Sequence, residues 1–333
     1  MDLVRFGLYD PSTREEDSTM TTLDSSDPER DDTGLILVPL DGTTDADAVL
    51  VQARGLLGLP DTQLLLFTAV DPLMFRYTMR PHRGIDDLER LERNLAREKE
   101  HLEQVASALE GLDVQIETRS GVGAEAILEC VDRVRPALVV LRSRARRSAP
   151  WFFGSVSRRV LRHCPAPLLV LPPEDTEQRF ASLLVPLDGS ETSERVLPLV
   201  ARLARHAGAT VTLCRFADGP HEFIESPDGG GPASHERLRS SLSRASRYLE
   251  TEGVQPRVRV GMGDPATEIL RVAAEEGADL VAMTTYGRSG WTRWVFGSVA
   301  DQVFSRCELP LLVVRTGGPR DAATNGEPAS GVS

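Results

Sequence analysis

Lysine is almost missing from this sequence of 333 residues: of its 38 basic residues, Lys99 alone is a lysine. Acidic residues number 50, so the net charge is −12. Nucleic-acid binding requires an excess of basic side chains to neutralise phosphates, so this charge excludes a general nucleic-acid partner. A P-loop that clamps phosphates with lysine is excluded as well, because Lys99 lies in a long polar helical pattern without the glycine-rich motif.

Cysteine is also scarce. The four cysteines are far apart in the sequence, with no CxxC pair, which argues against a disulfide framework or a structural zinc site. No segment approaches the roughly 20 consecutive apolar residues of a membrane span. The first 18 residues turn acidic where a secretory signal would be hydrophobic. The sequence therefore predicts a cytoplasmic protein with reduced thiols and no membrane contact.

An internal repeat divides the sequence into two units. The segment LVPLDG at Leu37–Gly42 recurs at Leu184–Gly189, and FGSV at Phe153–Val156 recurs at Phe296–Val299. A similar apolar strand, PLLVL in the first unit and PLLVV in the second, closes each unit. Landmarks repeated in the same order indicate duplicated domains. Because apolar strands at a sheet edge tend to be covered, we expect these two last strands to meet within one chain.

Short apolar runs alternate with helical patterns in each unit. In the second unit the predicted strands are Ser182–Leu187, Thr210–Phe216, Gln255–Val260, Leu280–Thr284 and Leu311–Val314. Asp264 followed by Pro265 predicts a helix N-terminus, and Ser298–Arg306 predicts a short helix. One face of a further helix carries four apolar residues, namely Leu238, Leu242, Ala245 and Leu249. This alternation predicts a parallel sheet with helices on both faces.

A carboxylate stands where such sheets bind ligands, beyond the carboxyl ends of central strands. Asp188 follows the first strand of the second unit, and Met283 and Thr284 end the fourth. If both strands are central and parallel, these residues meet at one edge. Asp188 could then accept hydrogen bonds from a ribose or an adenine amino group. Alternatively, it caps the following helix in competition with Ser190.

A glycine-rich segment, YGRSGWTRWVFGSVADQV, follows the fourth strand of the second unit. Gly287, Gly290 and Gly297 would let the backbone approach a phosphate closely. Ser298 is a natural helix N-cap, with Asp301 three positions later, and a helix N-terminus attracts anions. The same junction is also compatible with a purely structural turn, so these residues alone leave both readings open.

Taken together, these motifs resemble a tandem universal stress protein. The resemblance rests on VPLDGS, GDPATEIL, ADLVAMTTYGRSG, GSVADQV and CELPLLVV, and it covers about Leu35–Leu171 and Ser182–Arg315. It implies an α/β fold of two tandem Rossmann-like domains, each a five-stranded parallel sheet of order 3-2-1-4-5 flanked by helices. The expected boundaries are a disordered acidic tail (1–33), domain 1 (34–172), a linker (173–180), domain 2 (181–316) and a disordered tail (317–333).

The ATP-binding branch of that family has the signature G-x2-G-x9-G-[ST]. Gly287 and Gly297-Ser298 match it, whereas Thr284 replaces the first glycine. The resemblance implies an ATP site in domain 2, with Mg²⁺, and with no metal ligands or catalytic residues from the protein. The implied nucleotide-binding residues are Pro186, Leu187, Asp188, Met283, Thr284, Gly287, Gly290, Gly297, Ser298 and Val299.

Domain 1 departs from this pattern. Asp41 and Gly154-Ser155 are retained, but Leu141 and Arg144 replace the first two glycines. Bulky side chains obstruct the close backbone approach that glycine permits, so we expect a degenerate first site. An arginine cluster surrounds it, and forms either an ion-pairing face or a second anion site. The cluster comprises Arg142, Arg144, Arg146, Arg147, Arg158, Arg159 and Arg162.

The sequence thus favours a stress-response regulator that holds an adenine nucleotide in domain 2 and acts on an unidentified protein partner, without being an enzyme. Two alternatives remain at this point: a slow ATP-hydrolysing enzyme and a nucleotide-free scaffold dimer. A homodimer is compatible with the first reading too. The fold itself does not select among them.

Overall fold

The structure is a computed structural model of the chain. It describes residues 34–41, 48–51, 62–72, 85–109, 111–146, 149–152, 155–172, 179–218, 232–286 and 298–316. Both expected tails, 1–33 and 317–333, and residues 173–178 of the expected linker lie outside the described residues. Phe180, at the end of that linker, is fully buried in a hydrophobic core.

The described strands divide into two sets of five, which follow one another in the sequence. The first set is β1 (Leu35–Leu40), β2 (Gln63–Val70), β3 (Asp113–Ser120), β4 (Leu138–Arg142) and β7 (Leu168–Leu171). The second set is β8 (Ser182–Pro186), β9 (Thr210–Ala217), β10 (Arg257–Met262), β11 (Leu280–Tyr286) and β12 (Leu311–Thr316). A separate hairpin joins β5 (Arg144–Arg146) and β6 (Ala149–Phe152), within the segment rich in arginine.

These two sets form one sheet in the order β10-β9-β8-β11-β12-β7-β4-β1-β2-β3. Neighbours within each set are parallel, so each set has the order 3-2-1-4-5 and the predicted fold is confirmed. The last strands of the two sets, β7 and β12, pair antiparallel, with Leu169 opposite Leu312. The expectation that the two apolar last strands meet is therefore confirmed.

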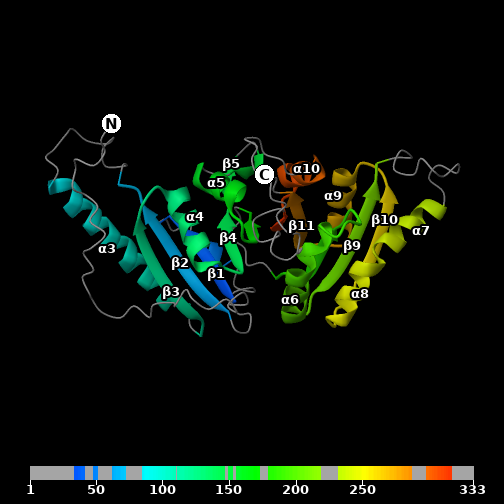
Figure 1. Cartoon of the computed structure of the whole chain (residues 1–333), viewed down its shortest axis with the longest axis horizontal. Helices are drawn as coiled ribbons and strands as arrows, with labels where there is room; N and C mark the ends of the chain where they lie inside the picture. The colour runs from blue at the N-terminus through cyan, green and yellow to red at the C-terminus, as the bar shows by residue number, and fades with distance from the viewer. Residues whose placement is uncertain are drawn as a thin grey trace, which may run out of the picture. The chain divides into compact units, whose positions relative to one another are not determined.

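Helices cover both faces of the strands. In the first half they are α3 (Ile85–Ser107), α4 (Gly123–Val134) and α5 (Ser155–His163). In the second half they are α6 (Leu197–Ala207), α7 (Pro232–Ser241), α8 (Ser243–Thr251), α9 (Pro265–Glu275) and α10 (Ser298–Arg306), with a 3₁₀ turn, η2 (Ser193–Val196), before α6. Figure 1 shows α6 and α8 in front of β9, with α9 behind it.

Each face of the sheet has its own hydrophobic core. In β1, Leu35 and Leu37 join a cluster with residues of α4, α5, α9 and α10, whereas Ile36 and Val38 join a second cluster with residues of α3, α6 and α8. Successive side chains of a strand point to opposite faces. A central parallel strand must therefore be apolar at every position, which explains why the strands read as continuous apolar runs.

One predicted helix is interrupted. Leu238, Leu242, Ala245 and Leu249 are all buried, as their spacing predicts. However, Leu242 is a turn residue between α7 and α8, so the single helix that the spacing implied is two helices. The start of α9 is as predicted, because the Asp264 side chain accepts a hydrogen bond from the Thr267 backbone N–H at 2.9 Å.

All four cysteines of the chain are described, and all are buried and free of disulfides. Burial raises the pKa of the Cys130 thiol to about 11 and that of Cys307 to about 11. Burial also raises the pKa of Cys214, which is fully buried on β9. Separately, no helix in the described part of the chain is long and apolar enough to cross a membrane.

Candidate functional site

The strand order reverses between β8 and β11. From β8 the chain continues to β9 and β10 on one side, whereas β11 and β12 lie on the other. The two strands are parallel, with Leu183 opposite Leu280 and Leu184 opposite Val281. In open α/β sheets, ligands bind outside the carboxyl ends of the strands at such a reversal. The candidate site of the second half therefore lies at the ends of β8 and β11.

Five of the ten predicted residues come from these two strand ends. Pro186 and Leu187 are buried, and Asp188 follows them as an exposed residue. On β11, Met283 is buried with 6% of its surface exposed, and Thr284 is half-buried. Continuing the β8–β11 register sets Met283 level with Pro186. The sheet thus brings these five residues to one edge.

The remaining predicted residues belong to the segment that leads into α10. Ser298 is exposed and Val299 half-buried, and both lie in the first turn of this helix. Ser298 is the first described residue of α10, and the residue before it lies outside the described residues, so the expectation that Ser298 is the N-cap stays a prediction. Gly287, Gly290 and Gly297 lie outside the described residues.

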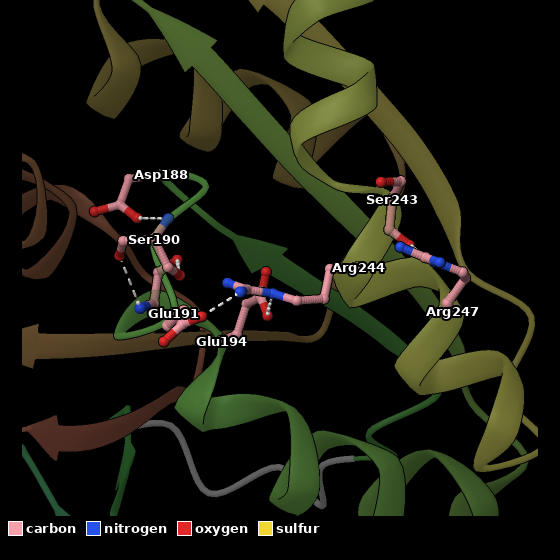
Figure 2. A network of polar contacts seen from close by, with 8 residues as sticks. Asp188, Ser190, Glu191, Glu194, Ser243, Arg244 and Arg247 are labelled. Carbon is pink, nitrogen blue, oxygen red and sulfur yellow. Dashed lines mark hydrogen bonds and ion pairs between the residues drawn. The ribbon is translucent and has the colours of Figure 1, made fainter. Parts of the chain in front are cut away.

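The loop after β8 is held by side-chain hydrogen bonds of its own residues (Figure 2). Asp188 Oδ1 accepts a hydrogen bond from the Ser190 backbone N–H at 2.8 Å, which is the Asx-turn arrangement. Ser190 Oγ accepts from the Ser193 N–H at 3.1 Å, and Ser193 Oγ donates to the Ser190 carbonyl at 2.8 Å. The Ser190 hydroxyl therefore accepts a hydrogen bond from the N–H of the first η2 residue, although the N-cap position is Thr192, and the Asp188 carboxylate bonds to the Ser190 N–H instead of capping a helix. The second Asp188 oxygen points away from the loop in Figure 2.

Asp188 is held in its ionised form. Partial burial raises the pKa of this carboxyl, but hydrogen bonds from Ser190 and Ser193 and the charge of Arg215 outweigh burial, so its pKa lies below the ordinary value of 3.8. An ionised carboxylate accepts hydrogen bonds and donates none. At neutral pH this position can therefore bind a group rich in donors, such as a ribose diol or an exocyclic amine.

Gly189 has a backbone conformation that requires glycine. Its φ is +84°, in the left-handed region. A Cβ atom at this position would also stand 2.4 Å from Arg215 Nη1 and 3.4 Å from Ser241 Cβ. Arg215, on β9, thus reaches under the loop close to Gly189. The DGS segment therefore forms a tight turn that lies directly on the end of β9.

A second arginine contacts the same loop from α8. Arg244 Nε donates to Glu194 Oε2 at 2.7 Å, and Arg244 Nη1 donates to Glu191 Oε1 at 2.6 Å (Figure 2). Hydrogen bonding to Glu194 raises the pKa of the Arg244 guanidinium. Arg215, Glu191, Glu194 and Arg244 were not predicted as site residues. No sequence spacing shows which distant side chains support the loop after β8.

A groove elsewhere in the described structure lies apart from Asp188. A surface groove of about 430 Å³ lies between α7 and β10, where it is lined by His235, Glu236, Arg239, Val258, Arg259 and Val260. It is an open groove at the edge strand and does not include Asp188. Among the described residues, no group of three or more His, Cys, Asp or Glu side chains could hold a metal ion.

The equivalent edge of the first half differs in chemistry. Asp41 follows β1 as an exposed residue, as Asp188 follows β8. At the end of β4, however, stand Arg142, which is half-buried, and Ser143, which is buried. On α5, Arg159 pairs with Glu125 of α4 at 2.9 Å, so at least one arginine of the cluster forms an intramolecular ion pair. The side chains of Arg144, Arg146 and Arg147 lie outside the described residues.

Comparison with known proteins identifies the family. The family model described as "Universal stress protein family" matches residues 34–172 and 180–315, which is most of the chain in two consecutive copies. The chain belongs to the universal stress protein family. Its two sets of strands are thus two tandem universal stress protein domains, as the sequence motifs implied.

Individual relatives match either most of the chain or about the length of one copy of the repeat. A universal stress protein of Mycolicibacterium smegmatis is 26% identical over 294 residues, covering 84% of this chain and 96% of that protein. YxiE of Bacillus subtilis is 30% identical over 150 residues, or 41% of this chain and 99% of YxiE. The crystal structure of an Archaeoglobus fulgidus universal stress protein covers 86% of this chain with a TM-score of 0.67. At 16% identity it supports the fold alone.

Proposed function

We propose that this universal stress protein binds one adenine nucleotide, ATP with Mg²⁺, in its second domain and works as a cytoplasmic ligand-dependent switch. The single observation that carries the proposal is the position of Asp188. This ionised carboxylate stands exposed at the reversal of strand order, beside the ends of β8 and β11.

The chemistry around Asp188 fits an adenosine. A carboxylate can accept two hydrogen bonds from a ribose diol, or one from an adenine amino group. Pro186, Leu187 and Met283 are apolar and adjoin it at the strand ends, so a flat base could pack against this edge. Ligand sites commonly combine apolar walls with a few polar groups in this way.

The start of α10 fits the phosphates. Ser298 and Val299 occupy the first turn of this helix, whose backbone N–H groups have no partners within the helix. These N–H groups, with the positive end of the helix dipole, favour an anion. The helix also packs against β11, which carries Met283 and Thr284. Both halves of a nucleotide would thereby meet residues at the same sheet edge. The first turn also carries Asp301, but no group of three or more His, Cys, Asp or Glu side chains among the described residues could hold a metal ion, so Mg²⁺ would be held by the phosphates.

We further infer that the site acts by binding and not by efficient hydrolysis. The only lysine of the chain, Lys99, lies in α3 of the first domain, so the second domain has no lysine to clamp a γ-phosphate. A carboxylate committed to adenosine cannot also position water at the distant γ-phosphate. A switch of this kind conveys its state to a partner protein through the ligand-dependent conformation of the domain.

Calorimetric titration of the full chain with MgATP tests the proposal, and the repeat supplies a matched control. Asp188→Asn keeps the shape of the side chain but removes its charge, and should weaken binding about tenfold or more. Asp41→Asn, the same change at the equivalent position of domain 1, should leave affinity unchanged. The expected stoichiometry is one nucleotide per chain.

Three results would refute this assignment. Binding at two equal sites, or equal losses in the two variants, would contradict the location in domain 2, and the absence of binding would favour a nucleotide-free scaffold. Phosphate release should be measured on the same samples. A turnover approaching the typical enzyme value of about 10 s⁻¹ would instead identify an ATPase.

A further inference from the structure

The junction of α7 and α8 lies against the Asp188 loop at two points. Ser241, the last residue of α7, has its Cβ 3.4 Å from the position that a Gly189 Cβ would occupy. Arg244, in the first turn of α8, extends its guanidinium toward the far side of the same loop (Figure 2). The loop is thus backed by a helix junction that is some 50 residues away in the sequence.

The two carboxylates that Arg244 contacts differ in burial. The Glu194 side chain is 13% exposed, whereas that of Glu191 is 86% exposed. Glu194 belongs to η2, and Glu191 belongs to the turn that precedes it. The planar guanidinium uses two different N–H groups, Nε and Nη1, for these partners. It therefore joins both arms of the turn to one fixed point on α8.

A continuous series of contacts connects Arg244 to Asp188. Glu194 follows Ser193 directly, and the Ser193 N–H and hydroxyl both bond to Ser190. The Ser190 N–H in turn bonds to Asp188 Oδ1. Fixing Glu194 therefore fixes the turn whose N–H orients the carboxylate.

We propose that Arg244 is a positioning residue, which holds the turn from Ser190 to Glu194 and so sets the orientation of the Asp188 carboxylate for its ligand. The consequence for affinity rests on the proposed nucleotide function, whereas the effect on the loop does not. Ion pairs at a surface contribute little to global stability. Loss of Arg244 should therefore change the order of this loop without unfolding the domain.

Amide hydrogen exchange without nucleotide measures that order directly. The amides of Ser190 and Ser193 are the donors to Asp188 and Ser190, so their exchange reports opening of the turn. In Arg244→Ala both amides should exchange about two- to fivefold faster, which is the range that an exposed ion pair commonly supplies. Affinity for MgATP should fall by a similar factor, while the melting temperature stays close to that of the wild type.

Arg247→Ala is the matched control. Arg247 is an exposed arginine one turn further along α8, and its Nε donates to the Ser243 carbonyl of its own helix. This variant should leave both the exchange and the affinity unchanged. In a background with Glu191→Gln and Glu194→Gln, adding Arg244→Ala should have little further effect, because the charged partners through which it acts are gone.

Unchanged exchange in Arg244→Ala, equal effects of Arg247→Ala, or faster exchange with unaltered MgATP affinity would each overturn the proposal. The proposal would also be overturned if Arg244→Ala, added to the variant with Glu191→Gln and Glu194→Gln, still accelerated amide exchange and weakened MgATP binding as much as it does in the wild type. If the wild type does not bind MgATP at all, the proposed function fails, and the exchange measurements alone then decide whether Arg244 holds the turn.

Discussion

At the scale of single residues, the candidate site depends on one turn with an unusual backbone. Gly189 combines a φ of +84° with close contact to Arg215. Gly253, after α8, has a φ of +79° but no atom within 4 Å of an added Cβ. Substituting alanine at each glycine therefore distinguishes two effects. At Gly253 the added methyl group costs only backbone strain, whereas at Gly189 it also displaces the Arg215 side chain.

Gly189→Ala and Gly253→Ala should each lower the free energy of unfolding by about 1 kcal/mol, because alanine disfavours positive φ. Only Gly189→Ala should also weaken MgATP binding, since its methyl group displaces the Arg215 guanidinium beside Asp188. Urea denaturation and calorimetric titration of both variants provide the comparison. Equal affinities in the two variants would show that Arg215 does not influence the site.

The sequence placed Asp188 at the sheet edge, but it predicted neither the turn that holds this residue nor the supports of that turn. Asp188, Gly189 and Ser190 are residue types that favour an Asx turn, and the structure shows that they form one. Arg215 and Arg244 could not be recognised in this way, because each acts through a contact between segments far apart in the chain. The sequence also left open whether Asp188 contacts a ligand or caps the following helix, since Ser190 competes for the same N–H groups.

At the scale of elements, equivalent helices of the two domains begin with different N-cap residues. In domain 2 the Asp264 carboxylate caps α9. In domain 1 the equivalent N-cap of α4 is Val122, whose side chain makes no capping bond and whose surface is 39% exposed. Val122 has an extended backbone, with φ −70° and ψ 121°, which is the conformation of a normal N-cap residue.

Val122→Asp should therefore raise the free energy of unfolding by about 1 kcal/mol, and Asp264→Ala should lower the melting temperature of the protein by roughly 3 °C. Urea denaturation of Val122→Asp and thermal melting of Asp264→Ala would measure these two changes. The two changes should shift stability in opposite directions, because Val122→Asp adds a capping carboxylate to α4, whereas Asp264→Ala removes the capping carboxylate of α9. A neutral Val122→Asp would indicate that the N–H groups at the start of α4 already have other partners.

The break between α7 and α8 shows where sequence patterns fall short at this scale. The four buried apolar residues are those that one continuous helix would bury. Just before the break, Ser240 Oγ and Ser241 Oγ donate to the carbonyls three residues earlier, at 2.9 and 2.6 Å. Such back-bonding distorts helices, and the Leu242 N–H follows with a bond to the Arg239 carbonyl. The spacing of apolar residues cannot reveal that serine hydroxyls compete with backbone N–H groups for these carbonyls.

At the scale of the whole molecule, the pairing of β7 with β12 joins two five-stranded sets into one sheet. Leu169 and Leu312 are opposite each other and belong to the same hydrophobic core, whereas Val313 belongs to the core on the other face. The apolar sequences of these strands predicted the meeting, but only the paired register shows which residues face each other.

Leu169→Cys combined with Leu312→Cys should consequently give a disulfide within one chain when dilute protein is refolded under oxidising conditions, which lets the two thiols react before they are buried. Leu169→Cys with Val313→Cys is the control, because those side chains point to opposite faces and should remain reduced. Non-reducing electrophoresis with peptide mapping distinguishes the products. Disulfides found only between chains would mean that this pairing is made by exchange between two molecules.

The burial of all four thiols limits how this protein can respond to an oxidising environment. Oxidants react with the thiolate, and burial disfavours that form in Cys130, Cys214 and Cys307 by raising the thiol pKa. Peroxide reaching the folded molecule should thus react slowly with these three thiols. Oxidation of these four residues should therefore follow unfolding of the domains instead of preceding it.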